Sequence, residues 1–285
     1  MHGDCVFGVY IDLEDIAKHF DDEIRKKDYT LAAQNFKIWS DKFIEQHKRY
    51  SDVIGAEYEI FGNDWYNRMV GDYDLEFIDN LYFKLNLVKF YAIEHLVKKY
   101  NNVLYLDLDV VPITNDNFFE FNDTQRFNCI WNFPIPWVSP TLFGKHLWRG
   151  YGPMSNRYHI KKRFTKQMYL QQKLTNFTGD SVLVNTGVIG TSSKPWNTLR
   201  FFDKFVSTLR NNYKVAKSLG NEYVDWAFEG DTMIGIKHQQ YDDSKLKTIS
   251  DEWNYAYKTG KDVSKAKFVH LISKTSFDSF FKEIL

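Results

Sequence analysis

The stretch VLYLDLDVVP, residues 103–112, places two aspartates at the end of an apolar run. Its Val, Leu and Tyr content is typical of a strand buried on both faces of a parallel sheet, and it predicts one strand over residues 103–111. Carboxylates separated by one residue of a strand point to the same face, which would let Asp107 and Asp109 share one cation. Oxygen ligands of this kind suit Mg²⁺ or Mn²⁺. The alternative is a solvated exit from the strand, without a ligand.

The segments before this stretch alternate between strand and helix patterns. They predict strands over residues 5–13 and 56–61 and helices over residues 31–47 and 81–100. This alternation is typical of βαβ units, so we predict an α/β fold with a mostly parallel central sheet flanked by helices. Ligands bind outside the carboxyl ends of the strands in such sheets, which places the two aspartates at the rim of a crevice.

The second part of the chain has a less regular pattern. It predicts strands over residues 127–131, 181–189 and 267–272, a helix over residues 198–211 capped by Asn197, an aromatic loop over residues 131–140 and a mobile basic loop over residues 150–166. Neither a repeat nor a clear linker interrupts the chain, so we predict one domain over residues 1–285.

Charge and cysteine content exclude several classes of protein. The chain carries 37 Lys and Arg against 37 Asp and Glu, and this zero net charge argues against a nucleic acid or an anionic membrane as partner. Two cysteines, Cys5 and Cys129, form neither a disulfide framework nor a zinc cluster, so we expect a reducing, cytoplasmic setting. The first residues lack a signal-peptide pattern, and no apolar run is long enough for a transmembrane segment.

Two later segments strengthen the interpretation of the aspartate pair. VNTGVIG, residues 184–190, is similar to the Asn-Ala-Gly-Val segment of GT-A glycosyltransferases, and VHLISK, residues 269–274, is similar to their C-terminal motif with a histidine. Together with a helix followed by VLYLDLDVV, these segments occur in the order and spacing of that family. The chain resembles GT-A glycosyltransferases over roughly residues 5 to 275. The likeness is greatest to the retaining family 8 type, which includes glycogenin-like and bacterial galactosyltransferase-like enzymes.

The resemblance implies a fold and a reaction. The fold would be the Rossmann-like GT-A fold, with about residues 1–112 as the nucleotide-sugar-binding half and about residues 113–285 as the acceptor-binding, metal-completing half. The reaction would be metal-dependent transfer of a sugar from a nucleotide diphosphate sugar, specifically a UDP-sugar, to a hydroxyl of a glycan or glycoconjugate acceptor. The anomeric configuration would be retained, and Mn²⁺ or Mg²⁺ would be the cofactor.

Carried over residue by residue, the resemblance implies that Asp107, Asp109 and His270 hold the metal, with neutral imidazole as the third ligand. Asp107 would also lie near the ribose. Lys274 would contact the diphosphate, although it follows His270 by only four residues and Ser273 stands where the family has glycine. His270 lies between apolar neighbours, so a buried core histidine is the alternative interpretation.

The same resemblance implies the residues of the donor site. Val9, Tyr10 and Asp12 would hold the base and ribose. Lys84 would approach the donor, and Asn185 and Gly187 would line the sugar pocket. Glycine at position 187 would let the backbone approach the sugar closely. The alternatives are that Tyr10 packs in the core and that Lys84, like Lys89 on the same helix, is solvated.

The acidic residue that the family places near the donor sugar has no plain counterpart. The segment EGDTMI offers Glu229 and Asp231, of which we favour Asp231, and Asp225 is a third candidate. Asp231 would orient the donor sugar or support positive charge in an oxocarbenium-like transition state. The sequence shows no well-placed nucleophile, which favours same-face attack assisted by the leaving phosphate.

Two other functions fit part of the pattern. A metal-dependent nucleotidyl- or phosphotransferase would use the same aspartates, but it needs a glycine-rich phosphate loop near the first strand, where FGVYIDLED has only Gly8. A catalytically degenerate carbohydrate-binding protein would bind sugar without metal. The tryptophans that could offer their faces to an acceptor sugar, or pack the second half of the chain instead, are Trp131, Trp137, Trp196, Trp226 and Trp253.

Overall fold

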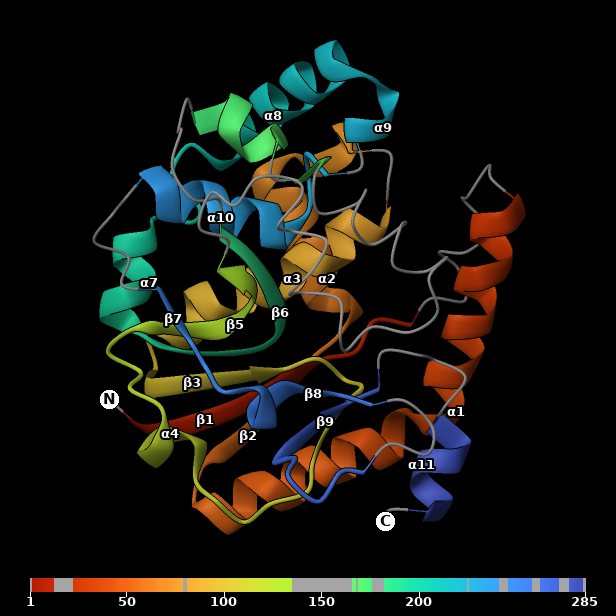
Figure 1. Cartoon of the computed structure of the whole chain (residues 1–285), viewed down its shortest axis with the longest axis vertical. Coiled ribbons are helices and arrows are strands. Elements are labelled where there is room, and N and C mark those ends of the chain that lie inside the picture. The colour runs from red at the N-terminus through yellow and green to blue at the C-terminus, as the bar shows by residue number, and fades with distance from the viewer. Residues whose placement is uncertain are drawn as a thin grey trace. The chain divides into compact units, whose positions relative to one another are not determined.

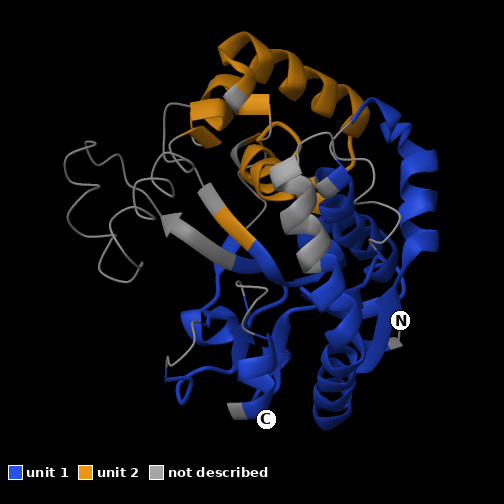
Figure 2. Cartoon of the chain, turned by 90° about the vertical axis from the view of Figure 1, so that its right-hand side faces the viewer, with its two compact units in different colours: residues 1–130, 186–196, 245–285 blue, residues 131–185, 197–244 orange. Residues whose placement is uncertain are grey.

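Figure 1 shows the computed structural model of the chain. The structure describes residues 2–12, 23–78, 81–134, 166–167, 169–175, 182–224, 226–240, 246–257, 262–271 and 277–283. The chain falls into two compact units, which Figure 2 colours separately. Unit 1 comprises Met1–Ile130, Thr186–Trp196 and Lys245–Leu285, and unit 2 comprises Trp131–Asn185 and Asn197–Ser244. The single domain expected over residues 1–285 stays a prediction.

The larger sheet has six strands in the order β2-β1-β3-β6-β5-β7 (Figure 1). β1 pairs in parallel with β2 and β3, β5 pairs in parallel with β7, and β6 runs antiparallel to β3. The predicted α/β fold with a mostly parallel sheet is therefore confirmed. The strands are β1 (His2–Val9), β2 (Glu57–Phe61), β3 (Tyr100–Leu106), β5 (Phe127–Pro134), β6 (Val182–Ser192) and β7 (Leu246–Thr248).

Helices provide the long connections that parallel strands require. α1 (Glu23–Ile54) leads from β1 to β2, while α2 (Asn63–Tyr73), the short 3₁₀ helix η2 (Leu75–Phe77) and α3 (Leu81–Leu96) lead from β2 to β3. α3 contacts both β1 and β3. Its side chains that are completely buried include Leu87, Val88, Ala92 and Ile93. The apolar stripe of this helix thus supplies the cover that the central strands need.

Unit 1 also contains a sheet of three strands in the order β4-β9-β8. The strands are β4 (Val110–Pro112), β8 (Tyr255–Ala256) and β9 (Phe268–His270). β9 runs antiparallel to β4 and parallel to β8. β9 therefore joins the C-terminal part of the chain to the segment that directly follows the aspartate pair.

The single strand predicted over residues 103–111 is wrong. β3 ends at Leu106, and the chain turns before β4 begins. The backbone N–H of Val110 donates to the carbonyl of Asp107 at 2.8 Å, which closes the turn. An apolar run indicates burial, but it does not indicate which neighbouring strand supplies the hydrogen bonds. Val110 pairs with β9, where it lies opposite His270. The two aspartates therefore lie in the turn that leads from one sheet to the other.

Phe118 fills the core next to this turn. Its ring lies in a buried cluster with Trp253 and Phe268, at centroid distances of 5.2 and 6.1 Å. Phe118 opens the short helix α4 (Phe118–Phe121). A Cβ atom at Gly190 on β6 would collide with the Phe118 ring. Glycine at position 190 thus leaves the space that this aromatic core occupies.

Gly190→Ala is expected to lower the free energy of unfolding by about 1–3 kcal/mol, because the added methyl group overpacks the core around Phe118. Urea unfolding followed by tryptophan fluorescence measures the change. Gly3→Ala is the matched control, since Gly3 also lies in a strand, has no positive φ, and a Cβ there meets nothing within 4 Å. Equal stabilities of the two variants would contradict this account of the core.

The helix predicted over residues 198–211 is wrong in its start and in its continuity. Pro195 is tolerated in the first turn of a helix, where its missing N–H has no helical partner, so the helix starts before it and includes Asn197. The chain then leaves helical geometry between Arg200 and Lys204, whose φ angles are 49° and 51°. Between β6 and β7 the structure describes the helices α7 (Ser193–Leu199), α8 (Phe205–Leu219), α9 (Asn221–Val224) and α10 (Gly230–Gln240).

The two predicted loops fall mainly outside the described residues. β5 continues to Pro134, so the first part of the loop expected over residues 131–140 is strand, and residues 135–140 are not described. In the basic loop expected over residues 150–166, the structure describes Lys166, which is helical. Among the described residues, the helices are too short or too polar to cross a membrane.

The last helix of the chain packs against the first. In unit 1, α11 (Phe277–Glu283) packs on α1, where the rings of Trp39 and Phe281 stack at 4.9 Å.

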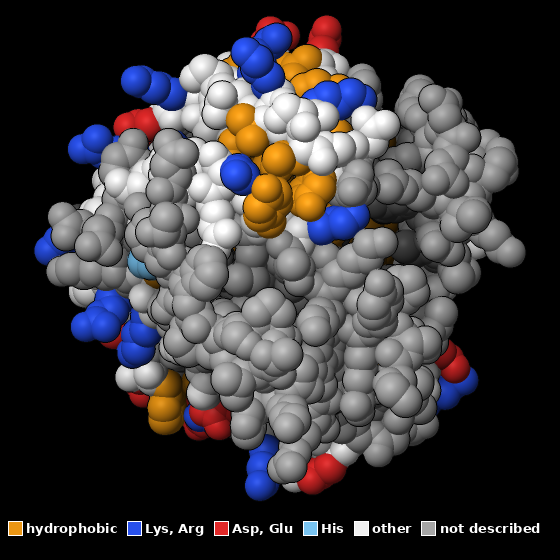
Figure 3. All heavy atoms as spheres, turned by 45° about the horizontal axis from the view of Figure 1, so that its top comes forward, with side chains coloured by type: hydrophobic (Ala, Val, Ile, Leu, Met, Phe, Trp, Pro, Cys, Tyr) orange, Lys and Arg blue, Asp and Glu red, His pale blue; other side chains and the backbone are white. Residues whose placement is uncertain are grey.

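Figure 3 shows a face on which hydrophobic side chains gather beside Lys and Arg. In unit 2, Tyr169 and Tyr213 are each 40% exposed, and Lys173 Nζ lies 5.3 Å from the centre of the Tyr169 ring. Unit 2 thus presents aromatic and basic side chains together to solvent.

Candidate metal centre

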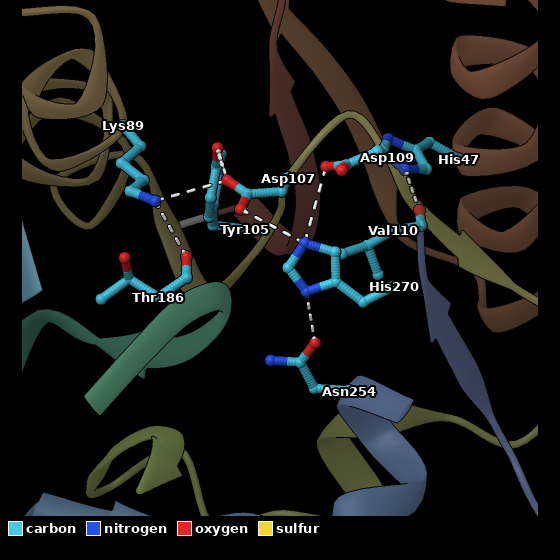
Figure 4. Close-up of polar contacts among 9 residues, drawn as sticks. All are labelled: His47, Lys89, Tyr105, Asp107, Asp109, Val110, Thr186, Asn254 and His270. Carbon is cyan, nitrogen blue, oxygen red and sulfur yellow. Dashed lines mark hydrogen bonds and ion pairs between the residues drawn. The ribbon is translucent and has the colours of Figure 1, made fainter. Parts of the chain in front are cut away.

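Asp107, Asp109 and His270 meet at one point of unit 1 (Figure 4). One ligand atom from each of the three residues lies within 4.8 Å of the other two. His270 Nε2 is 3.9 Å from Asp107 Oδ2 and 3.7 Å from Asp109 Oδ1. The structure thus brings together the three residues that the sequence predicts as metal ligands, in an arrangement that could hold one ion.

The backbone fixes this group from two sides. The N–H of Asp107 donates to the carbonyl of Gly187 on β6 at 2.7 Å, which extends the ladder of β3 by one residue. The carbonyl of Asp109 accepts from the N–H of Leu271 at 2.9 Å, just after His270 at the end of β9. The turn is therefore tied to both sheets, and the directions of its two carboxylates follow from the backbone.

Two donors hold the carboxylate of Asp107. Tyr105 donates its hydroxyl to Oδ1 at 2.6 Å, and Lys89 Nζ donates to the same oxygen at 3.3 Å and to the carbonyl of Thr186 at 3.1 Å. Burial, with Asp107 close by, raises the pKa of Tyr105 well above its usual value, so the hydroxyl keeps its proton and remains a donor. Figure 4 shows the consequence: Oδ1 is occupied, while Oδ2 faces His270.

Lys89 is a residue of the site that the sequence interpretation passed over in favour of Lys84. The two lysines lie on α3 five residues apart, about 140° around a helix, so they face different directions. Lys89 is buried and reaches Asp107, whereas Lys84 is half-buried and its predicted contact with the donor stays a prediction. The available signal was a lysine embedded between apolar residues of a buried helix, where a charge needs a partner.

Asn254 determines which nitrogen of His270 faces the carboxylates. It ends the 3₁₀ helix η4 (Asp251–Asn254), is buried, and its Oδ1 lies 2.8 Å from His270 Nδ1. Since an amide oxygen only accepts, Nδ1 carries the proton and Nε2 presents its lone pair toward Asp107 and Asp109. No local pattern indicates this contact, because the two residues meet through the pairing of β8 with β9.

Asn254→Leu is expected to raise the Kd for Mn²⁺ by 10- to 100-fold, because the His270 ring loses the acceptor that fixes its tautomer and orientation. Asn254→Asp keeps an acceptor and should bind at least as tightly as the wild type. Isothermal titration calorimetry measures both. Asn122→Leu is the control, since Asn122 is also buried but bonds the carbonyl of Phe118. An unchanged Kd in Asn254→Leu would refute this role.

The predicted nucleotide residues lie at the same sheet edge as Asp107, because β1 and β3 run parallel. Val9 and Tyr10 are half-buried, and the N–H of Tyr10 donates to the carbonyl of Phe61 at 2.9 Å. Asp12 is exposed, and its N–H donates to Asn63 Oδ1 at 3.0 Å. Their roles in holding a base or ribose stay predictions.

No protein-family model and no curated protein matches this chain. Similar solved structures include a glycosyltransferase involved in the glycosylation of the major capsid of PBCV-1, with 14% identity, a TM-score of 0.48 and 98% of each chain covered. The galactosyltransferase LgtC, in complex with donor and acceptor sugar analogues, is 13% identical, with a TM-score of 0.41 over 94% of this chain and 86% of its own. Mouse xyloside xylosyltransferase 1 is 10% identical, with a TM-score of 0.41, and the match covers 96% of this chain and 99% of its own.

The remaining predicted residues divide between unit 2 and the part of the chain that is not described. Asn185 is half-buried on β6, and Asp231 is half-buried in the first turn of α10, directly after Glu229 and Gly230. Lys274 and Asp225 lie outside the described residues. The roles predicted for these side chains stay predictions.

Two of the tryptophans considered for an acceptor site are core residues. Trp196 is buried against Phe127 and donates Nε1–H to Glu94 at 2.6 Å, and Trp253 is buried beside Phe118. Neither presents a ring face to solvent. Trp226 is half-buried, and the side chains of the other two considered, Trp131 and Trp137, are not described.

Proposed function

We propose that this protein is a metal-dependent GT-A glycosyltransferase that moves a sugar from a nucleotide diphosphate sugar to an acceptor hydroxyl. The observation that carries the proposal is the meeting of Asp107, Asp109 and His270 within 4.8 Å at the carboxyl edge of β3. Sheets of this type bind ligands at that edge. The three residues come from two of the three motifs on which the family resemblance rests.

The residues present fit a divalent cation. Two carboxylates and one neutral imidazole form a donor set suited to Mn²⁺ or Mg²⁺, and the imidazole nitrogen favours Mn²⁺. Three protein ligands leave coordination positions free for phosphate oxygens. Lys89 and Tyr105 hold the Asp107 carboxylate in place before the ion arrives. A bound cation would stabilise negative charge on the departing diphosphate.

The chain's own residues complete the proposed reaction. Val9, Tyr10 and Asp12 hold the nucleotide at the end of β1, with uracil as the base, and Lys84 approaches the donor. Lys274 steadies the diphosphate as it leaves. Residues that line the sugar pocket or orient the sugar are Asn185, Gly187 and Asp231. We infer retention of configuration through same-face attack by the hydroxyl of a glycan or glycoconjugate, assisted by the leaving phosphate.

A thermal-shift screen of the full chain with nucleotides and nucleotide sugars, each with and without Mn²⁺, tests the proposal. A UDP-sugar at 100 times its Kd should raise the Tm by about 5 °C, and only when Mn²⁺ is present. An unchanged Tm with every nucleotide diphosphate would refute the proposal. A higher Tm with free sugars in the absence of metal would instead indicate a carbohydrate-binding protein. Release of pyrophosphate from nucleoside triphosphates, measured separately, would indicate a nucleotidyltransferase.

A further inference from the structure

His47 reaches the metal-binding turn from α1 and is not one of the proposed ligands (Figure 4). Its side chain is completely buried, and its Nε2 lies 2.6 Å from the carbonyl oxygen of Val110. A carbonyl only accepts, so the ring proton is on Nε2. Val110 is the residue whose N–H closes the turn onto Asp107. His47 therefore holds the chain at the point where the turn becomes β4.

The bonds of this turn leave its backbone little freedom. The carbonyl of Asp109 is held by Leu271 from β9, and the next carbonyl, that of Val110, is held by His47 from α1. With two successive carbonyls fixed by two different segments, the peptide planes after Asp109 cannot rotate. The direction of the Asp109 side chain depends on these planes, so the bond from His47 bears directly on the geometry of the carboxylate.

The second nitrogen of the His47 ring is also buried. Burial lowers the pKa of His47 to about 4, so the ring is neutral and Nδ1 is an acceptor. Within the described part of the chain, neither Nδ1 nor the hydroxyl of Tyr58 on β2 has a hydrogen-bond partner, and both atoms are buried. Burial also raises the pKa of Tyr58, which keeps its hydroxyl protonated and able to donate.

Gly8 shows that these two atoms border the same space. A Cβ atom at this position of β1 would lie 3.4 Å from His47 Nδ1 and 3.3 Å from the Tyr58 hydroxyl oxygen. Two buried polar atoms left unpaired would each lose the hydrogen bonds that water gives them in the unfolded chain. Proteins satisfy such pairs with an internal water that bonds to both.

We propose that His47 is a positioning residue for the metal-binding turn, and that one buried water, held between His47 Nδ1 and the Tyr58 hydroxyl, fixes its ring. The inference rests on the proposed metal site and extends it by a support that runs from β2 through α1 to the turn. Tyr58 donates to the water, the water donates to Nδ1, and Nε2–H donates to Val110. Three elements of unit 1 thus act together on Asp109.

Two measurements on His47→Leu test the positioning role. Hydrogen–deuterium exchange of the peptide spanning residues 105–112, in the metal-free protein, should be faster than in the wild type by about tenfold or more. Calorimetry should show a Kd for Mn²⁺ about 5- to 10-fold higher. His47→Gln, which keeps an N–H donor of similar reach, should restore most of the slow exchange and most of the Mn²⁺ affinity of the wild type. Ser51→Ala, which removes a buried hydrogen bond one turn later on α1, is the control and should change neither.

Tyr58→Phe tests the water. It should raise the Kd for Mn²⁺ about threefold, and should add nothing in a His47→Leu background. A Tm that stays the same or rises in Tyr58→Phe would mean that the hydroxyl was unpaired and would overturn the water link. If the wild type binds no Mn²⁺, the proposed metal site is wrong. Hydrogen–deuterium exchange of the metal-free turn then tests the positioning role of His47 by itself. Equal exchange in His47→Leu and Ser51→Ala overturns the positioning role.

Discussion

Asp109→Asn is expected to abolish measurable Mn²⁺ binding and to lower the rate of sugar transfer on the order of 10³-fold, equivalent to about 4 kcal/mol of transition-state stabilisation. The carboxylate is buried and lies 3.7 Å from His270 Nε2, so no water-exposed group can take its place. An amide has no charge to offer a cation. The Tm increase expected from Mn²⁺ and a UDP-sugar in the wild type should disappear with it.

The same substitution should not destabilise the metal-free protein. Without a cation, Asp109 and Asp107 are like charges in one site, and replacing one carboxylate by an amide relieves their repulsion. The expected pattern is thus an unchanged or higher Tm without metal and no shift with metal. Asp123→Asn is the matched control, because Asp123 is exposed and pairs only weakly with Arg126 at 3.6 Å. Transfer at the wild-type rate in Asp109→Asn would refute the proposed role of this carboxylate and the metal dependence of the reaction.

Lys89→Met is expected to lower the stability of the metal-free protein by about 2 kcal/mol, since it leaves Asp107 without its cationic partner. Lys89 is buried and Asp107 is 28% exposed, so the solvent screens part of the loss. The substitution should also tighten Mn²⁺ binding by about tenfold, because a positive charge next to the ion is removed. Tyr105 still donates to Asp107 at 2.6 Å and keeps that carboxylate oriented.

Urea unfolding and calorimetry with Mn²⁺ separate these two effects. Lys89→Arg retains the charge and should resemble the wild type in both. Lys98→Met is the control, because Lys98 is 64% exposed and its ion pair with Glu94 lies on the surface. Weaker Mn²⁺ binding in Lys89→Met would show that the lysine mainly orients Asp107, and the expected repulsion between Lys89 and the ion would be wrong.

The sequence was enough to predict the parallel part of the fold and the meeting of three candidate ligands. Apolar runs alternating with helical periodicity specify buried strands and covering helices, and β1, β2 and β3 follow that pattern. The candidate ligands Asp107, Asp109 and His270 could be chosen because a divalent cation requires such side chains, whatever the surrounding packing. Both signals are carried by residue type at a given spacing.

What the sequence did not reveal depends on contacts between distant segments. Whether residues 107–109 continue a strand or turn depends on β9, which enters from the other end of the chain. The choice of Lys89 over Lys84 depends on which side of α3 faces Asp107. Asn254 and His47 carry no local pattern at all, because an ordinary polar residue becomes important only through the atom that it meets.

The order of segments in unit 1 has a consequence for how the protein is made. Unit 1 is built from three pieces of chain, and Asp107 and Asp109 belong to the first while His270 belongs to the last. A chain emerging from the ribosome therefore carries Asp107 and Asp109 before His270 has been made. β9 must arrive before the turn has its partner strand, so any metal affinity would appear only after β9 has been synthesised and has paired with β4.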